Sequence, residues 1–266
     1  MKHNLQVTLI LIGLYLLAQY IGLFVTSVYL EKTLPFDIER PELDETYSFL
    51  QIFVAILIVT FLVMFIVKYE VGIVWKILFF ISIWYTVMLS LSSFLIPNLA
   101  LVLGLVAGYF KVFQKNIVVN NLIELFVYGG LAALFVPILT LVSISLLLVL
   151  ISIYDMIAVW KTKHMVKMAK FQTKEGIFPG FMIPYGKDRV AILGGGDVGF
   201  PLIFAGVVYS VYGLLALVVP VMVAVSLFLL FYFGEKSKYY PAMPFLSIGC
   251  FVGFGLVRFL SVVFWI

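Results

Sequence analysis

The chain has 266 residues, of which 64% are hydrophobic and only 11% charged, whereas an ordinary globular domain has roughly 45–50% apolar and about 25% charged residues. A soluble domain of this length needs a polar shell that the composition does not supply, so a soluble fold is excluded. The net charge of +4 does not indicate a nucleic-acid partner, because the basic residues lie in short connections between apolar runs.

Nine apolar segments, each near the roughly 20 residues that cross a bilayer, follow one another along the chain. They lie near 5–30, 49–67, 72–94, 96–113, 117–137, 139–160, 189–210, 213–233 and 241–265. The first is longer than a signal-peptide core and has no small-residue cleavage pattern, so it is predicted to remain as a span. We therefore predict an all-α polytopic membrane protein with one domain over 1–266, in which 1–160 holds six spans, 161–188 is a loop and 189–266 holds three spans.

The basic residues predict how this bundle is oriented. On the N-terminal side lie fourteen: Lys2, Lys68, Lys76, Lys111, Lys115, Lys161, Lys163, Lys167, Lys170, Lys174, Lys187, Arg189, Lys236 and Lys238. The opposite side holds only Lys32 and Arg40, in an acidic connection. Because cytoplasmic connections carry the excess of Lys and Arg, the N-terminus is predicted inside and, with an odd number of spans, Ile266 outside.

The longest connection, residues 161–188, is then cytoplasmic. Its first part is basic and compatible with a helix, whereas 176–186 is apolar but interrupted by Gly and Pro. Such a segment is too short and too interrupted to span, so we expect it to lie at the membrane interface or to cover another part of the protein.

Four charged side chains fall inside predicted spans and away from their ends, namely Glu124, Asp155, Asp197 and Arg258. They are informative because a charged group at the centre of a membrane helix costs roughly 2.5–3.5 kcal/mol. Glu124 is expected near the interface, hydrogen-bonded to Asn120 and Asn121 in a structural role. Arg258 is expected to reach the outer interface or to pair with a neighbour.

The two aspartates are predicted to lie at the same depth. Asp155 precedes Lys161 by six positions and Asp197 follows Arg189 by eight, which places both roughly 9–12 Å inside the cytoplasmic boundary at a rise of about 1.5 Å per residue. Consecutive antiparallel spans joined by a cytoplasmic connection can bring them face to face. We therefore predict that Asp155 and Asp197 form a pair.

Paired carboxylates suit peptide hydrolysis. The ionised one takes a proton from water while the protonated one polarises the scissile carbonyl. Neither a metal nor a cofactor is expected, since His3 and His164 lie outside the spans and no zinc motif is present. A serine triad is not expected either, and a nucleotide site at Gly194, Gly196 and Gly199 lacks the acidic residue that should follow.

Three motifs carry a resemblance to a known family: Tyr154-Asp155 in one span, Gly194-Gly195-Gly196-Asp197 in the next, and Pro241-Ala242-Met243 at the start of the last. This set resembles the presenilin and signal peptide peptidase family of intramembrane aspartyl proteases, which usually has Pro-Ala-Leu in the third motif. The exchange of Leu for Met keeps volume and apolarity. The predicted orientation is similar to that of presenilin and opposite to that of signal peptide peptidase.

The resemblance implies a role for each motif residue. It makes Asp155 and Asp197 the catalytic pair, with no metal and no cofactor. It assigns substrate binding to six other residues of the motifs: Tyr154, Gly194, Gly196, Pro241, Ala242 and Met243. Glycines also let a backbone approach closely, and we hypothesise that residues 189–193 offer a strand edge to an unwound substrate.

The function predicted from the sequence is an intramembrane aspartyl endopeptidase. Its partners would be the transmembrane helices of single-span substrate proteins and the lipid bilayer, with no nucleic acid; whether copies of the chain form a homo-oligomer stays open. The chain is predicted to be an integral multi-pass membrane protein, located in the cell membrane if the source is prokaryotic. A proton-coupled transporter or ion-leak channel is the alternative, because intramembrane carboxylates also relay protons, and a prepilin-type peptidase is a third.

Overall fold

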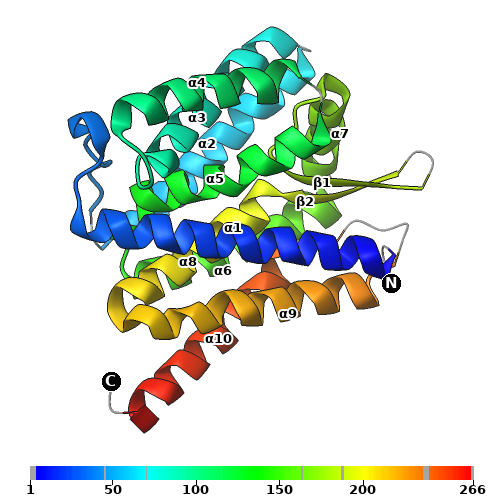
Figure 1. Ribbon diagram of the computed structural model, residues 1–266. Coiled ribbons are helices and arrows are strands. Elements are labelled where there is room, and N and C mark those ends of the chain that lie inside the picture. The colour runs from blue at the N-terminus through cyan, green and yellow to red at the C-terminus, as the bar shows by residue number, and fades with distance from the viewer. Residues whose placement is uncertain are drawn as a thin grey trace.

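The computed structural model describes residues 4–44, 46–69, 71–114, 116–162, 164–186, 189–235 and 240–264. The chain folds as a bundle of long helices with one small sheet near one end (Figure 1). The helices are Leu5–Glu31 (α1), Ser48–Lys68 (α2), Gly72–Leu91 (α3), Pro97–Phe113 (α4), Ile117–Phe135 (α5), Leu141–Met156 (α6), His164–Glu175 (α7), Gly195–Tyr212 (α8), Val218–Phe233 (α9) and Met243–Phe264 (α10). The strands are Gly180–Tyr185 (β1) and Arg189–Gly194 (β2).

Local chemistry explains why tightly spaced helices begin where they do. Pro97 occupies the first turn of α4, where its missing N–H has no cost. The Asn116 side chain accepts hydrogen bonds from two backbone N–H groups at the start of α5, and the Thr140 hydroxyl accepts one at the start of α6. These caps satisfy donors that a helix leaves free at its N-terminus.

The predicted multi-pass architecture is confirmed. Among the described residues, seven helical runs are long and apolar enough to cross a membrane, and Pro97–Phe113 is a shorter apolar helix. One of the seven, Gly195–Phe233, contains both α8 and α9, and Figure 1 shows the chain turning back between them. The turn lies at Gly213, whose φ of 57° favours glycine. The count of nine spans stays a prediction.

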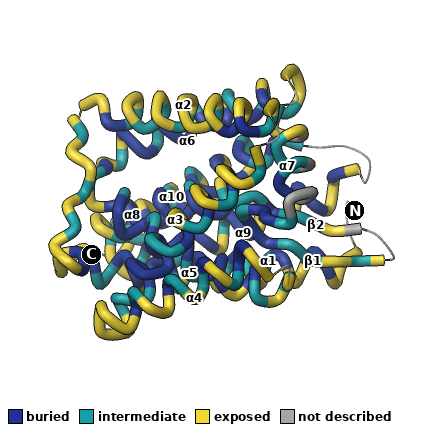
Figure 2. The backbone as a smooth tube through the Cα atoms, turned by 90° about the horizontal axis from the view of Figure 1, so that it is seen from above, coloured by how far each residue is buried: buried dark blue, intermediate teal, exposed yellow. Residues whose placement is uncertain are grey.

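The core is built around α1, α5 and α8. Buried side chains of α1 and α8, such as Tyr15 and Phe204, belong to one hydrophobic cluster that extends to α6, α9 and α10. By contrast, α2 lies at the periphery and turns most of its apolar surface outward (Figure 2); Phe61, for example, is 69% exposed. Apolar surface of this kind suits contact with lipid.

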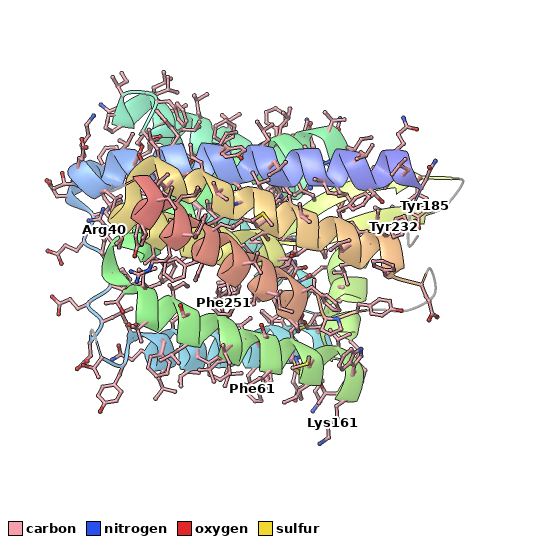
Figure 3. All side chains as sticks on the ribbon, turned by 90° about the horizontal axis from the view of Figure 1, so that it is seen from below. Arg40, Phe61, Lys161, Tyr185, Tyr232 and Phe251 are labelled. Atoms are coloured by element: carbon pink, nitrogen blue, oxygen red, sulfur yellow. The ribbon has the colours of Figure 1, made fainter. Side chains whose placement is uncertain are left out.

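The prediction for the region around the long connection is wrong at 189–194, which was assigned to a span. The basic first part forms α7 as expected, but Gly180–Tyr185 and Arg189–Gly194 form an antiparallel pair of strands, and Phe181 is fully buried. The seventh span therefore begins at Gly195 and not at 189. Lys161 and Tyr185 lie at the end of the bundle opposite Arg40 (Figure 3), as the predicted division into a basic and an acidic side requires.

Candidate active site

Asp155 lies in the last turn of α6 and is 5% exposed. Its Oδ2 accepts a hydrogen bond of 3.0 Å from the backbone N–H of Met243, the first residue of α10. This N–H has no partner within its own helix, because the first N–H groups of any helix are free. The carboxylate of the first motif therefore caps the helix that carries the third motif, 88 positions along the chain.

A second contact keeps α6 and α10 in this alignment. One turn before Asp155, the Ser152 hydroxyl lies 2.9 Å from the Ser247 hydroxyl, which is one turn into α10. Pro241 and Ala242 come directly before α10, and the Ala242 carbonyl accepts two of its first N–H groups. The predicted motif of residues 241–243 is thus the N-terminus of α10, placed on Asp155.

Asp197 is the third residue of α8 and is partly exposed. Gly194 ends β2 and caps α8, and the N–H of Gly195 donates to the Pro179 carbonyl at 2.9 Å. The helices α6, α8 and α10 all pack against one another. Both aspartates consequently lie at helix N-termini, Asp197 at that of α8 and Asp155 at that of α10, where free N–H groups and the helix dipole favour a carboxylate.

Gln19, which lies in α1 and is fully buried, is outside the three motifs and was not predicted as a site residue. Its Nε2 donates to the carbonyl of Val198, the residue after Asp197, at 2.8 Å. Pro201 lacks the N–H that would otherwise bond the Asp197 carbonyl, so this turn of α8 depends on support from outside. A buried glutamine within the first span was the available signal, since a polar group in a span needs a partner.

Tyr154 faces a different neighbour from Asp155. Its hydroxyl hydrogen-bonds His164 Nε2 in α7 at 2.8 Å, and its ring contacts Phe53 of α2 edge-on. His164 is held on its other nitrogen by the Thr162 hydroxyl, at 2.6 Å. Partial burial lowers the pKa of the His164 imidazole, so the ring is neutral at pH 7. The structure therefore directs Tyr154 toward α7, and its role in substrate binding stays a prediction.

An apolar cavity of about 650 Å³ reaches the glycines before Asp197. Side chains of α2, α3 and α5 form most of its wall, and the missing side chains of Gly195, Gly196 and Gly199 leave room along α8. Pro179 and Glu124 line it where it meets β1. The cavity is thus closed on one side by the helix that carries the second motif.

The outward backbone groups of the two strands differ in their hydrogen-bond partners. In an antiparallel pair, residues opposite each other either exchange both backbone bonds or turn them outward, in alternation. Gly180 and Met182 of β1 bond side chains of α5, so their partners in register, Gly194 and Ile192, turn their backbone groups to the far side. Among the described residues, nothing hydrogen-bonds the outward groups of Ile192.

The other two ionisable residues within spans both have structural partners. Glu124 is 1% exposed and forms a buried ion pair with Lys111 of α4. Lys111 is likewise buried and is not a residue of an exposed loop. Arg258 donates to the Tyr212 hydroxyl at 2.9 Å, which confirms the expected pairing.

Comparison with known proteins identifies the fold. The structure of a presenilin family intramembrane aspartate protease in space group C222 superimposes with a TM-score of 0.68 at 20% sequence identity, over 95% of this chain and 99% of that one. The same description applies to a structure in space group P2, with a TM-score of 0.67 at 20% identity over 94% and 96% of the two chains. No protein-family model matches the sequence, and no curated protein matches it significantly. The chain has the presenilin-family fold.

Proposed function

We propose that this membrane protein is an aspartyl endopeptidase that hydrolyses peptide bonds within transmembrane segments, with Asp155 and Asp197 as its catalytic pair. The observation that carries the proposal is the hydrogen bond between Asp155 and the Met243 N–H. It joins the first and third motifs in a chain with the fold of presenilin-family proteases, and α8 with the second motif packs against both helices.

The chemistry follows from two carboxylates that share one proton. The ionised aspartate accepts a proton from water, whose oxygen adds to the scissile carbonyl carbon, while the protonated aspartate donates a hydrogen bond to the carbonyl oxygen. Collapse of the tetrahedral adduct breaks the C–N bond, and the amine leaves with a proton from the acid. No metal or cofactor enters this scheme.

The cavity and β2 supply the proposed path of the substrate. A transmembrane segment would enter the apolar cavity between α2, α3, α5 and α8 and unwind next to the glycines of α8. An unwound backbone in a dry site needs hydrogen-bond partners. The outward groups of Ile192 can supply them by strand addition, a few residues before Asp197.

The test is cleavage of a single-span reporter by the purified protein in lipid vesicles, with products identified by mass spectrometry. We expect Asp155→Asn and Asp197→Asn each to abolish cleavage, since an asparagine side chain can neither take a proton from water nor donate one to the leaving amine. Asp44→Asn is the control, because Asp44 is exposed in the α1–α2 connection. Full cleavage by either active-site variant would refute the proposal. Ion flux that depends on Asp197, without proteolysis, would instead support a transporter.

A further inference from the structure

The outer edge of β1 is occupied by side chains. At Gly180, the Asn120 amide donates to the carbonyl at 3.0 Å, and the N–H donates to Glu124 at 3.0 Å. At Met182, the Asn121 amide donates to the carbonyl at 2.8 Å and accepts from the N–H at 3.0 Å. All four outward backbone groups of these two residues are therefore bonded to α5, as a third strand would bond them.

The amide of Asn120 is held in the orientation that this requires. Lys111 Nζ donates to Asn120 Oδ1 at 2.8 Å and is ion-paired with Glu124. The oxygen of the amide is thereby committed to Lys111, so its nitrogen faces Gly180. Buried polar networks of this kind specify one arrangement when every member is bonded.

The backbone at Gly180 admits this close arrangement only because it is glycine. Its φ is +146°, and a Cβ there would lie 2.2 Å from the Leu193 carbonyl oxygen. No other residue fits between β2 and α5 at this point. The position of β1 is therefore set from both sides.

We propose that Asn120, Asn121 and Glu124 act as positioning residues that close the outer edge of β1, so that an extended segment can add only to β2. Glu124 lines the cavity as well as contacting β1, so without this closure the outer edge of β1 would be open next to the cavity. Only β2 continues directly into the helix of Asp197. The closure thereby sets which substrate bond reaches the aspartates, an inference that rests on the proposed proteolytic function.

The experiment compares the Asn121→Leu variant with the wild-type protein in two measurements. Hydrogen exchange of the 180–185 segment should become at least about tenfold faster, because the Met182 N–H loses its acceptor. Cleavage of the reporter should yield additional products displaced by one or two residues. The control is Asn116→Ala, which removes the cap of the same helix without touching β1 and should leave the set of products unchanged.

The two measurements test the closure of the β1 edge and its role in bond selection separately. Unchanged exchange in Asn121→Leu would overturn the closure, and faster exchange with an unchanged set of products would overturn its role in selecting the bond. If Asn121→Leu cleaves nothing, Asn121→Asp decides by its products: it keeps the acceptor for the Met182 N–H and loses the donor to the Met182 carbonyl, so it should yield the additional products, and an unchanged set would overturn the role in selecting the bond. A wild-type protein without any proteolysis would refute the proposed function, whereas faster exchange in the variant would still support the closure.

Discussion

The first turn of α8 shows how one residue can support another across the fold. Pro201 removes the helical bond of the Asp197 carbonyl, and Gln19 donates to the next carbonyl, that of Val198. Asp197 is thus placed at a turn that its own helix stabilises incompletely. Freedom to loosen this turn is useful for a residue that must meet a substrate backbone, and Gln19 limits that freedom.

We expect Gln19→Leu to lower the cleavage rate by about tenfold, because small displacements of a reacting group have large effects on rate. It should also lower the free energy of unfolding by roughly 1–3 kcal/mol, the cost of a lost buried hydrogen bond. Reporter cleavage and thermal unfolding in detergent measure the two effects. Thr8→Val in the same helix is the control, since the Thr8 hydroxyl has no partner among the described residues; equal activities of the two variants would contradict the prediction.

At the scale of elements, β2 is the segment whose edge the proposed mechanism needs. The alternation of the pair turns the Ile192 N–H away from β1, since its partner Met182 bonds α5. A proline at 192 would therefore spare the bonds between the strands and remove only the outward donor.

We expect Ile192→Pro to lower reporter cleavage by at least about tenfold, the loss of roughly 1.4 kcal/mol of substrate interaction, and Ile192→Val to leave it within about twofold. Hydrogen exchange of 180–185 should be similar in the two variants, which shows that the sheet persists. Equal cleavage by both would rule out strand addition at this residue.

At the scale of the whole molecule, the buried ion pair of Lys111 and Glu124 joins three parts of the fold. Lys111 belongs to α4 and Glu124 to α5, and Glu124 also accepts the Gly180 N–H of β1. The pair thus fixes the sheet to the bundle. Removal of one partner leaves an uncompensated charge in an apolar interior.

We expect Lys111→Met to lower the free energy of unfolding by roughly 3–5 kcal/mol, seen as a lower Tm in detergent. Adding Glu124→Gln should recover part of the loss, because the amide oxygen can still accept the hydrogen bond from the Gly180 N–H and no unpaired buried charge remains. A double variant no more stable than Lys111→Met would argue that the pair contributes through packing alone.

Part of this architecture could be predicted because it depends on neighbours along the chain. Runs of apolar residues and the positions of Asp155 and Asp197 relative to the basic connections are local properties, and they predicted most of the helices and the pairing of the two aspartates. The strand at 189–194 was assigned to a span because a short apolar run does not distinguish strand from helix; its partner strand and α5 decide the matter.

By itself the sequence determined that the protein is a multi-pass membrane protein and where most of its helices lie, since the bilayer imposes length and apolarity on each segment separately. Only the tertiary structure decided that Met243 donates to Asp155, that Gln19 supports Asp197 and that α5 covers β1. These contacts join residues 56 or more positions apart. Their geometry arises from helix packing, which no local pattern specifies.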